Sequence, residues 1–283
     1  MTPPGFEQLV AANGAFDADA AATTLLTHAV AGLHHLDPSG MSLTRWLVVG
    51  GAPVLVQVTL QATGVLVRTA STDNGVNEAV VELTRHWFDL ETDLAPINAH
   101  LGADPVFTEH VRARPGLRAT RVPVGFEAVQ LAVLGQQVSL AAGRLFGARL
   151  VAAYGSSTDH PHLQRFPTAT VVAAQPLDAL RASIGLTRSR ARTVHEVAAL
   201  FADLGDDQVL PDRPVLAGVH GIGPWTLDYL AIRADRDPDA FPVNDAVLRR
   251  VLSSRGLDDA PTAAVAWQPH RSYAALRLWS MAV

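Results

Sequence analysis

The sequence predicts an α+β domain over residues 1–95, followed by a mostly α-helical domain over residues 96–283. Short segments rich in valine and leucine, bounded by glycine turns, occur before residue 70 and predict strands. From Pro96 onward such segments nearly disappear, and apolar residues recur at helical spacing. A chain of 283 residues is long enough for roughly two domains with a substantial core.

The first domain is predicted to combine helices and strands. Apolar side chains at helical spacing predict a helix over residues 16–36, which Asp37-Pro38-Ser39-Gly40 ends. Strands are expected on both sides of a Gly50-Gly51-Ala52-Pro53 turn, and a third strand follows Gly64. The expected strands are residues 45–49, 54–60 and 65–68, and a second helix is expected at residues 76–89.

The second domain is predicted to consist of helices joined by short turns. Phe126, Val129 and Val133 form one apolar helix face, and the polar segment 135–137 ends it. Ser139 is predicted to cap the next helix. The expected helices after this point are 139–154 (ended by Gly155), 176–184, 187–204, one that begins at Asp245 and a last one that ends near Trp279.

Two glycines one residue apart, Gly221 and Gly223, mark a tight turn between two helices. Glycine permits backbone conformations that other residues avoid, so the amides of such a turn can approach a phosphate closely. Pro224 and Trp225 then open an apolar helix, whose N-terminal partial positive charge faces the same place. The pattern therefore predicts an anion-binding hairpin.

A single acid, Asp245, follows a proline-containing turn and opens the next helix. Aspartate commonly caps helices, so a structural role is compatible with this position as well as a catalytic one. The glycines would also suit a dinucleotide-binding turn, with a strand at residues 215–217 and Asp245 as the acid that binds ribose. Pro242 would interrupt the strand that leads to this acid, which disfavours the dinucleotide alternative.

Composition narrows the possible functions. Apolar residues make up 48% and charged residues 17% of the chain, as in soluble globular proteins. No apolar run reaches the roughly 20 residues of a membrane span and no signal segment opens the sequence, so a cytoplasmic protein is expected. The chain has no cysteine, which excludes disulfides, thiolate zinc sites and an iron–sulfur cluster.

The charge of the chain limits how it would bind nucleic acid. A net charge of −5 argues against a diffuse basic surface, but it permits binding through amides, a helix terminus and a few arginines. All 22 basic residues are arginine. Because lysine is absent, no side chain can form a Schiff base with an opened sugar.

The hairpin and the acid together resemble the motif of helix-hairpin-helix DNA glycosylases and, within them, of the DNA-3-methyladenine glycosylase II (AlkA-type) family. That motif is a Gly-Ile-Gly-x-Trp-Thr hairpin, then a tyrosine, then a proline-rich turn that ends in the catalytic aspartate. Residues 134–139 and 267–274, with Trp279, match two further family segments. The matching motif residues are Gly221, Ile222, Gly223, Trp225, Thr226, Tyr229 and Asp245.

The resemblance implies a fold and a site. The N-terminal module would resemble half of a TATA-binding-protein fold, and two helical subdomains would flank an active-site cleft. Asp245 would be the catalytic carboxylate, and Trp225, Tyr229 and Trp279 would line the pocket for the damaged base. The implied DNA contacts are Gln136, Gln137, Gly221, Gly223 and Thr226, with Gln137 as the wedge that fills the gap left by the flipped nucleotide.

The resemblance also implies an activity. The family flips an alkylated base out of double-stranded DNA and hydrolyses its N-glycosidic bond in base excision repair, and a monomer is expected. Bifunctional relatives carry lysine where this chain has Trp225, so a monofunctional enzyme without lyase activity is expected. No cofactor is required, although the main-chain carbonyls of Ala217, Val219 and Ile222 would hold a sodium or potassium ion at the hairpin.

Two other functions remain compatible with the sequence, namely a module that only grips DNA and an enzyme that excises deaminated or oxidised bases. Alkylation at N3 or N7 makes a purine cationic, and aromatic faces attract a desolvated cation by about 2 kcal/mol. A cationic base leaves readily, so one carboxylate suffices where sugar hydrolases use two. Asp245 would either stabilise the oxocarbenium-like sugar or activate water.

Overall fold

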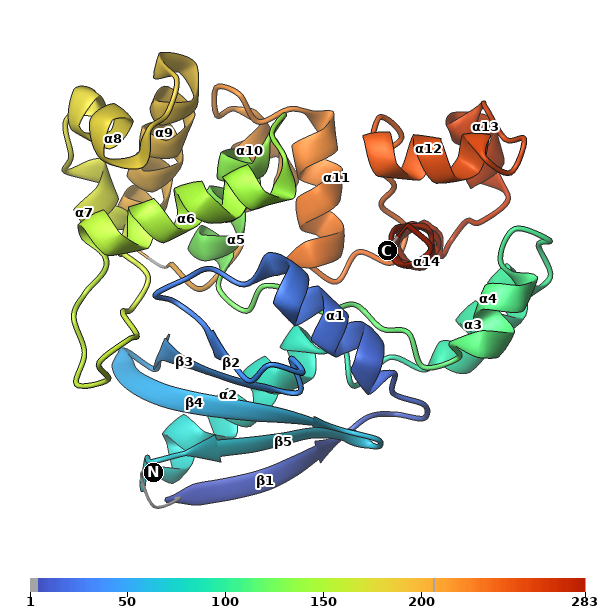
Figure 1. Ribbon diagram of the computed structural model, residues 1–283, viewed down its shortest axis with the longest axis horizontal. Helices are drawn as coiled ribbons and strands as arrows, with labels where there is room; N and C mark the ends of the chain where they lie inside the picture. Colours follow the sequence, from blue (N-terminus) through green and yellow to red (C-terminus); the bar gives the residue numbers. More distant parts are fainter. Residues whose placement is uncertain (1–4, 206, 283) are drawn as a thin grey trace.

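The first domain contains one five-stranded antiparallel sheet, which lies below the helical domain in Figure 1. The computed structural model describes residues 5–205 and 207–282. The strand order is β1-β5-β4-β3-β2, and every neighbouring pair is antiparallel, which confirms the predicted α+β fold. The strands are β1 (Phe6–Ala11), β2 (His35–Leu36), β3 (Ser42–Val49), β4 (Ala52–Gln61) and β5 (Gly64–Thr69).

The β3–β4 hairpin explains why this sheet was predictable. Side chains of both strands alternate between buried and more exposed positions, the pattern of a sheet with one covered face. Gly50 and Gly51 join the strands with positive φ angles of 59° and 79°, which glycine adopts without steric cost. The covered face packs with α1 (Ala18–His28) and α2 (Asn74–Trp87) in one apolar core.

Three features of this domain differ from the prediction, and one is that strand β2 lies within residues 16–36, which were predicted as a helix. Helix α1 ends at His28, well before the predicted end. Val30 and Leu33 continue the apolar spacing beyond it, but they pack against Val151 of the helical domain in a small separate core. Strand β1 was not predicted, because it is an edge strand in which Val10 alone is buried and no alternation shows.

The second domain is helical, as predicted. Helix α6 begins after Ser139, whose hydroxyl accepts the Ala142 amide at 3.2 Å, and Gly155 follows its last residue. Helices α8 and α9 occupy the positions predicted for them. The helices are α3 (Leu94–Gly102), α4 (Thr108–Ala113), α5 (Gly125–Gly135), α6 (Leu140–Tyr154), α7 (Ala169–Ala173), α8 (Leu177–Ile184), α9 (Arg188–Leu204), α10 (Arg213–Ala217), α11 (Pro224–Arg233), α12 (Ala246–Ser253), α13 (Ala260–Val265) and α14 (Arg271–Ser280).

Two apolar cores lie on either side of α11. One core is built mainly from α5 to α10, and the other from α3, α4 and α12 to α14. Helix α11 supplies Leu227 and Leu230 to the first core, and Ala231 and Ile232 to the second. It therefore forms the wall between two helical subdomains, and Figure 1 shows it between them.

The fold bears on the dinucleotide-binding alternative and on the search for membrane spans. Residues 215–217 belong to helix α10, so the strand that a dinucleotide-binding turn requires is replaced by a helix. Within residues 5–205 and 207–282, no helix has both the length and the apolar character needed to cross a bilayer.

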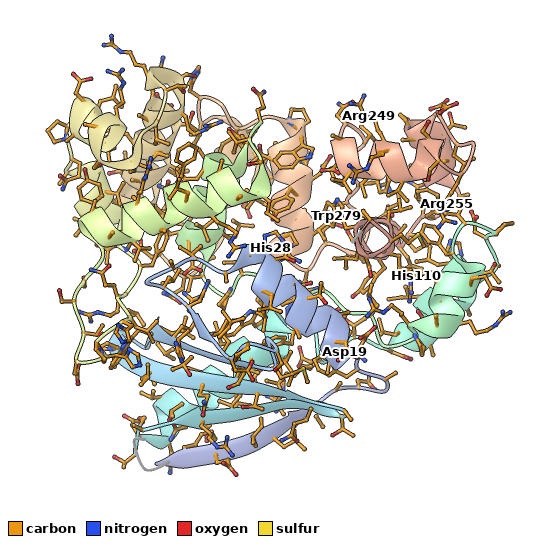
Figure 2. All side chains as sticks on the ribbon, in the orientation of Figure 1. Asp19, His28, His110, Arg249, Arg255 and Trp279 are labelled. Atoms are coloured by element: carbon orange, nitrogen blue, oxygen red, sulfur yellow. The ribbon has the colours of Figure 1, made fainter. Side chains whose placement is uncertain are left out.

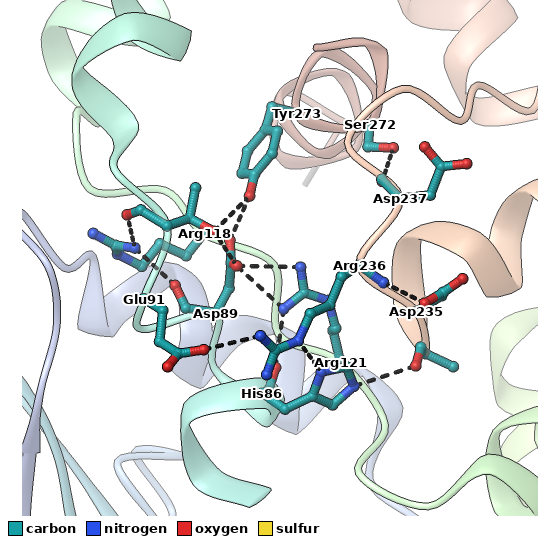
Figure 3. A network of polar contacts seen from close by, with 12 residues as sticks. His86, Asp89, Glu91, Arg118, Arg121, Asp235, Arg236, Asp237, Ser272 and Tyr273 are labelled. Atoms are coloured by element: carbon teal, nitrogen blue, oxygen red, sulfur yellow. Dashed lines mark hydrogen bonds and ion pairs between the residues drawn. The ribbon is translucent and has the colours of Figure 1, made fainter. Parts of the chain in front are cut away.

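A buried polar cluster joins the two domains (Figure 3). Asp89, in the turn after α2, accepts hydrogen bonds from both terminal nitrogens of Arg121 at 3.2 Å and from the Tyr273 hydroxyl at 2.8 Å. Arg118 donates to the Asp89 carbonyl at 2.7 Å. We call these four residues the Asp89 joint. Because Tyr273 belongs to α14, the joint attaches the last helix of the chain to the N-terminal domain.

Candidate active site

The side chains of Trp225, Tyr229 and Trp279 are among those that line a cavity of about 740 Å³, a volume typical of small-molecule sites. Trp225 and Tyr229 lie one turn apart on α11, and their rings stack with centroids 5.2 Å apart and planes 17° apart. Trp279 of α14, labelled in Figure 2, meets Tyr229 edge-on at 5.9 Å. We call these three residues the aromatic wall.

Asp245 lies beside the aromatic wall, immediately before α12. Its amide donates to the Pro242 carbonyl at 2.8 Å, which forms the turn that delivers the side chain. The carboxylate oxygen Oδ1 accepts the amides of Val247 and Leu248, both at 3.0 Å. Asp245 therefore caps α12, as predicted, while its side chain lines the cavity and is 8% exposed.

The two indoles of the aromatic wall hold the same carboxylate. Nε1 of Trp225 donates to Oδ2 of Asp245 at 2.9 Å, and Nε1 of Trp279 donates to Oδ1 at 3.2 Å. With the amides of Val247 and Leu248, four N–H groups thus donate to this carboxylate, and they fix its orientation. A fixed acid beside aromatic faces suits the stabilisation of positive charge inside the cavity.

The hairpin between α10 and α11 spans residues 218–223. Gly221 has a φ of 83°, and a Cβ there would lie 2.4 Å from Oγ1 of Thr193, so glycine is required. Gly223 has an ordinary φ of −103°, and a Cβ there would meet no atom within 4 Å. Only Gly221 thus needs the conformational freedom of glycine. Gly223 instead leaves open space before the N-terminus of α11, where unpaired amides can approach an anion.

Both parts of the chain match known family models. Residues 10–124 match the AlkA N-terminal domain, and residues 131–266 match the HhH-GPD superfamily of base excision DNA repair proteins. The DNA-3-methyladenine glycosylase of Bacillus subtilis is 30% identical over 219 residues, which cover 71% of this chain and 72% of that protein. The chain belongs to the DNA-3-methyladenine glycosylase family.

Members of this family differ in length. DNA-3-methyladenine glycosylase 2 of Escherichia coli is 30% identical over 208 residues, which cover 71% of each protein. Relatives in Mycobacterium tuberculosis, named probable bifunctional transcriptional activator/DNA repair enzyme AlkA, are 35% identical over 211 residues. That match covers 69% of this chain but 41% of those proteins, so the chain spans less than half of their length.

Solved structures share the fold at low sequence identity. The 3-methyladenine DNA-glycosylase from Archaeoglobus fulgidus matches with a TM-score of 0.80 over 98% of both chains, at 17% identity. An 8-oxoguanine glycosylase/lyase from Clostridium acetobutylicum matches with a TM-score of 0.66 over 88% of both chains, at 16% identity. Proteins named for an alkylated base and for an oxidised base thus share this scaffold. The fold alone therefore leaves the choice of lesion to side chains in the cavity.

Two of the residues implied as DNA contacts in this family point into the protein. The side-chain amide of Gln136 donates to Oγ1 of Thr226 at 2.8 Å and to the Gly221 carbonyl at 3.0 Å. Thr226 is only 2% exposed. Its side chain is therefore turned away from solvent, and its place among the DNA contacts stays a prediction. The pair instead braces the hairpin against the end of α5.

Gln137 differs from its neighbour. It is exposed and lies in the turn between α5 and α6. Its φ of 52° is in the left-handed region, which is uncommon for a residue other than glycine and costs conformational energy. An exposed side chain on a strained backbone is typical of a functional position.

The cavity is also lined by residues that no sequence motif singled out. Arg233 follows Trp225 and Tyr229 at four-residue spacing on one face of α11, and this spacing was a signal that could have identified it. His28 of α1 lines the same cavity. Burial, together with the positive charges of Arg233 and Arg144, lowers the pKa of His28 to about 3, so this imidazole is neutral at pH 7.

Proposed function

We propose that this protein is a monofunctional DNA glycosylase that excises alkylated bases from double-stranded DNA by hydrolysis of the N-glycosidic bond. The Asp245 carboxylate held by two indoles of the aromatic wall is the observation that carries this proposal. A cationic base flipped into the cavity would stack on these rings. As the bond breaks, positive charge develops on the sugar beside the carboxylate, which stabilises it directly or activates a water molecule.

The absence of lysine supports a reaction without strand cleavage. Lyase chemistry on an abasic sugar requires an amine that forms a Schiff base, and no side chain of this sequence provides one. Trp225, whose N–H holds the Asp245 carboxylate, occupies the position at which bifunctional relatives carry that amine.

Base release from a duplex with one 3-methyladenine tests this proposal. We expect free 3-methyladenine in solution and strand breaks only after alkali treatment of the abasic product. Strand cleavage without alkali would contradict the monofunctional proposal, and binding without base release would identify a module that only grips DNA. Duplexes with hypoxanthine or 8-oxoguanine test whether the enzyme instead excises deaminated or oxidised bases. If either base is released faster than 3-methyladenine, alkylated bases are not the main substrate class.

We propose that DNA is held by the hairpin amides and by Gln137. The open space at Gly223 lets a phosphate reach the N-terminus of α11. Gln137 is exposed at the end of α5, where its side chain would fill the gap left by the flipped nucleotide. Its amide could hydrogen-bond the unpaired base on the opposite strand, which an apolar wedge could not do.

We also propose that the hairpin holds a monovalent cation through main-chain carbonyls. Among the described residues, no hydrogen bond is donated to the carbonyls of Ala217 or Ile222, and Val219 accepts one, from the Ile222 amide at 3.1 Å. Carbonyl oxygens suit sodium or potassium. Within the same residues, no group of three or more His, Cys, Asp or Glu side chains is placed to hold a metal. The ion would stabilise the turn and add positive charge near the phosphate.

Gly223→Ala is expected to weaken binding to duplex DNA about tenfold, which corresponds to about 1.4 kcal/mol. The added methyl group would enter the space through which the phosphate approaches, while the fold has room for it. Gly221→Ala is the matched variant. Because it forces a Cβ against Thr193 at a φ of 83°, we expect it to reduce the free energy of unfolding by about 1–3 kcal/mol.

Fluorescence anisotropy with a duplex that carries an abasic-site analogue measures the first effect, and denaturant unfolding measures the second. A Gly223→Ala protein that binds DNA as tightly as the wild type would show that phosphate does not approach this amide.

A further inference from the structure

Arg233 is a buried cation without an anionic partner. Its side chain is 6% exposed and lines the cavity, and its Nε atom has no hydrogen-bond partner. None of the ion pairs within residues 5–205 and 207–282 includes it. The guanidinium is hydrogen-bonded to the side chain of Tyr229, which is a hydroxyl and not a carboxylate, so its charge has no counter-ion among the described residues. Burying a charge is costly unless it is neutralised, which indicates a partner that arrives from outside the protein.

The carboxylates that line the cavity are engaged elsewhere. Glu127 of α5 forms a buried ion pair with Arg45 of β3, and the Arg45 Nη1 atom donates to Oε1 at 3.0 Å. Asp245 is held by four N–H groups at the other end of the aromatic wall. His28 lies nearby but is neutral, because its pKa is about 3. None of these side chains offsets the charge of Arg233.

Arg233 keeps its charge despite this environment. Burial lowers its pKa from the ordinary value, while the neighbouring Tyr229 side chain opposes the shift. Arginine remains protonated in proteins at neutral pH, and its guanidinium offers donors but no acceptor. Beside Tyr229, the cavity therefore presents N–H donors of a guanidinium.

The position of Arg233 on α11 indicates which edge of a flipped base it would face. Trp225, Tyr229 and Arg233 lie along one face of α11. Helical side chains point back toward the N-terminus, so the guanidinium reaches toward Tyr229. Asp245 contacts Trp225 at the opposite end of this stripe, where the sugar would lie. A base stacked on the rings would consequently direct the edge farthest from its sugar toward Arg233.

We propose that Arg233 determines lesion specificity by donating hydrogen bonds to a carbonyl oxygen on the far edge of the flipped base, an inference that rests on the glycosylase function proposed above. The 6-position of a purine lies on that edge. A 6-oxopurine, such as 7-methylguanine or hypoxanthine, presents an acceptor there, whereas a 6-aminopurine, such as 3-methyladenine or 7-methyladenine, presents N–H donors. Between two bases with the same charge and the same methyl position, a site that donates to an oxygen favours the 6-oxopurine, because a 6-amino group leaves those donors unpaired.

The experiment compares release of 7-methylguanine and 7-methyladenine from the same methylated DNA, because both bases carry a positive charge and the same methyl position. Arg233→Met preserves the approximate length of the side chain and removes its donors and its charge. We expect the ratio of the two release rates, 7-methylguanine to 7-methyladenine, to fall about tenfold in this variant. Arg236→Met is the matched control, since Arg236 pairs with Glu91 at 2.9 Å on the surface and outside the cavity.

An unchanged ratio in a folded Arg233→Met protein that releases both bases would overturn the inference. A second measurement uses the wild-type protein and needs no variant and no catalysis. Free hypoxanthine should raise the midpoint of thermal unfolding more than free adenine does, since hypoxanthine has a carbonyl oxygen at the 6-position and a proton on N1, whereas adenine has an amino group at the 6-position. Equal or reversed shifts would overturn the inference. A wild-type protein that releases no base from damaged DNA would overturn the proposed function, and the comparison of free bases would still test Arg233.

Discussion

Asp245→Asn is expected to slow base release by about 10²- to 10³-fold, the effect of losing one preorganised electrostatic contact, while DNA binding stays nearly unchanged. The asparagine oxygen can still accept the amides of Val247 and Leu248, so α12 keeps its cap. The asparagine amide nitrogen would replace the oxygen that accepts the Trp225 N–H, and the negative charge beside the sugar would be lost.

Single-turnover release from methylated DNA measures this effect, and anisotropy on an abasic-site duplex measures binding. Asp259→Asn is the matched control. Asp259 also caps a helix, α13, by accepting the Thr262 amide at 3.1 Å, but it does not line the cavity. This control should retain wild-type rates. Wild-type rates in Asp245→Asn itself would remove Asp245 from the mechanism.

Asp89→Ala is expected to lower the free energy of unfolding by about 3–5 kcal/mol, the cost of leaving a buried charge without its partner. Asp89 is 5% exposed, and the variant would remove the anionic partner of the Arg121 guanidinium and one of the two acceptors of the Tyr273 hydroxyl (Figure 3). Burial, together with the Asp89 charge, raises the pKa of Tyr273 to about 12, so its hydroxyl remains a donor at neutral pH. Trp279 lies on the same helix as Tyr273, so loss of the joint should also loosen the aromatic wall.

Unfolding in denaturant measures this loss. The matched control is Glu91→Gln, which removes an ion pair with Arg236 whose two side chains are about half exposed. We expect this control to change stability by less than about 1 kcal/mol, as for most surface ion pairs. Equal effects of the two substitutions would show that the Asp89 joint contributes no more than a surface contact.

Much of the fold was predictable because its signals are local. The alternation in β3 and β4, the serine cap of α6 and the spacing of α8 and α9 depend on neighbouring residues, and the structure has these elements where they were predicted. Edge strand β1 gave no such signal, because most of its side chains are exposed. Helix α1 was predicted too long, because Val30 and Leu33 are buried by a distant helix rather than by their own.

Some features of the candidate site were likewise predictable from local sequence, and others were not. The hairpin, the helix that carries Trp225 and Tyr229, and the capping position of Asp245 are encoded within short segments. The inward position of Thr226 and the unpaired charge of Arg233 depend on what packs around each side chain. Such contacts join segments far apart in the chain, so no local pattern reports them.

The sequence by itself determined the two-part fold, the hairpin with its glycines and the chemistry available to the chain, which excludes thiolate clusters and lysine Schiff bases. These properties follow from composition and from residues close together in the chain. The tertiary structure decided that Trp225 of α11 and Trp279 of α14 both donate to the carboxylate of Asp245, and that a buried arginine without a counter-ion lines the same cavity. The physical reason is that burial and hydrogen-bond partners are set by the packing of elements distant in sequence.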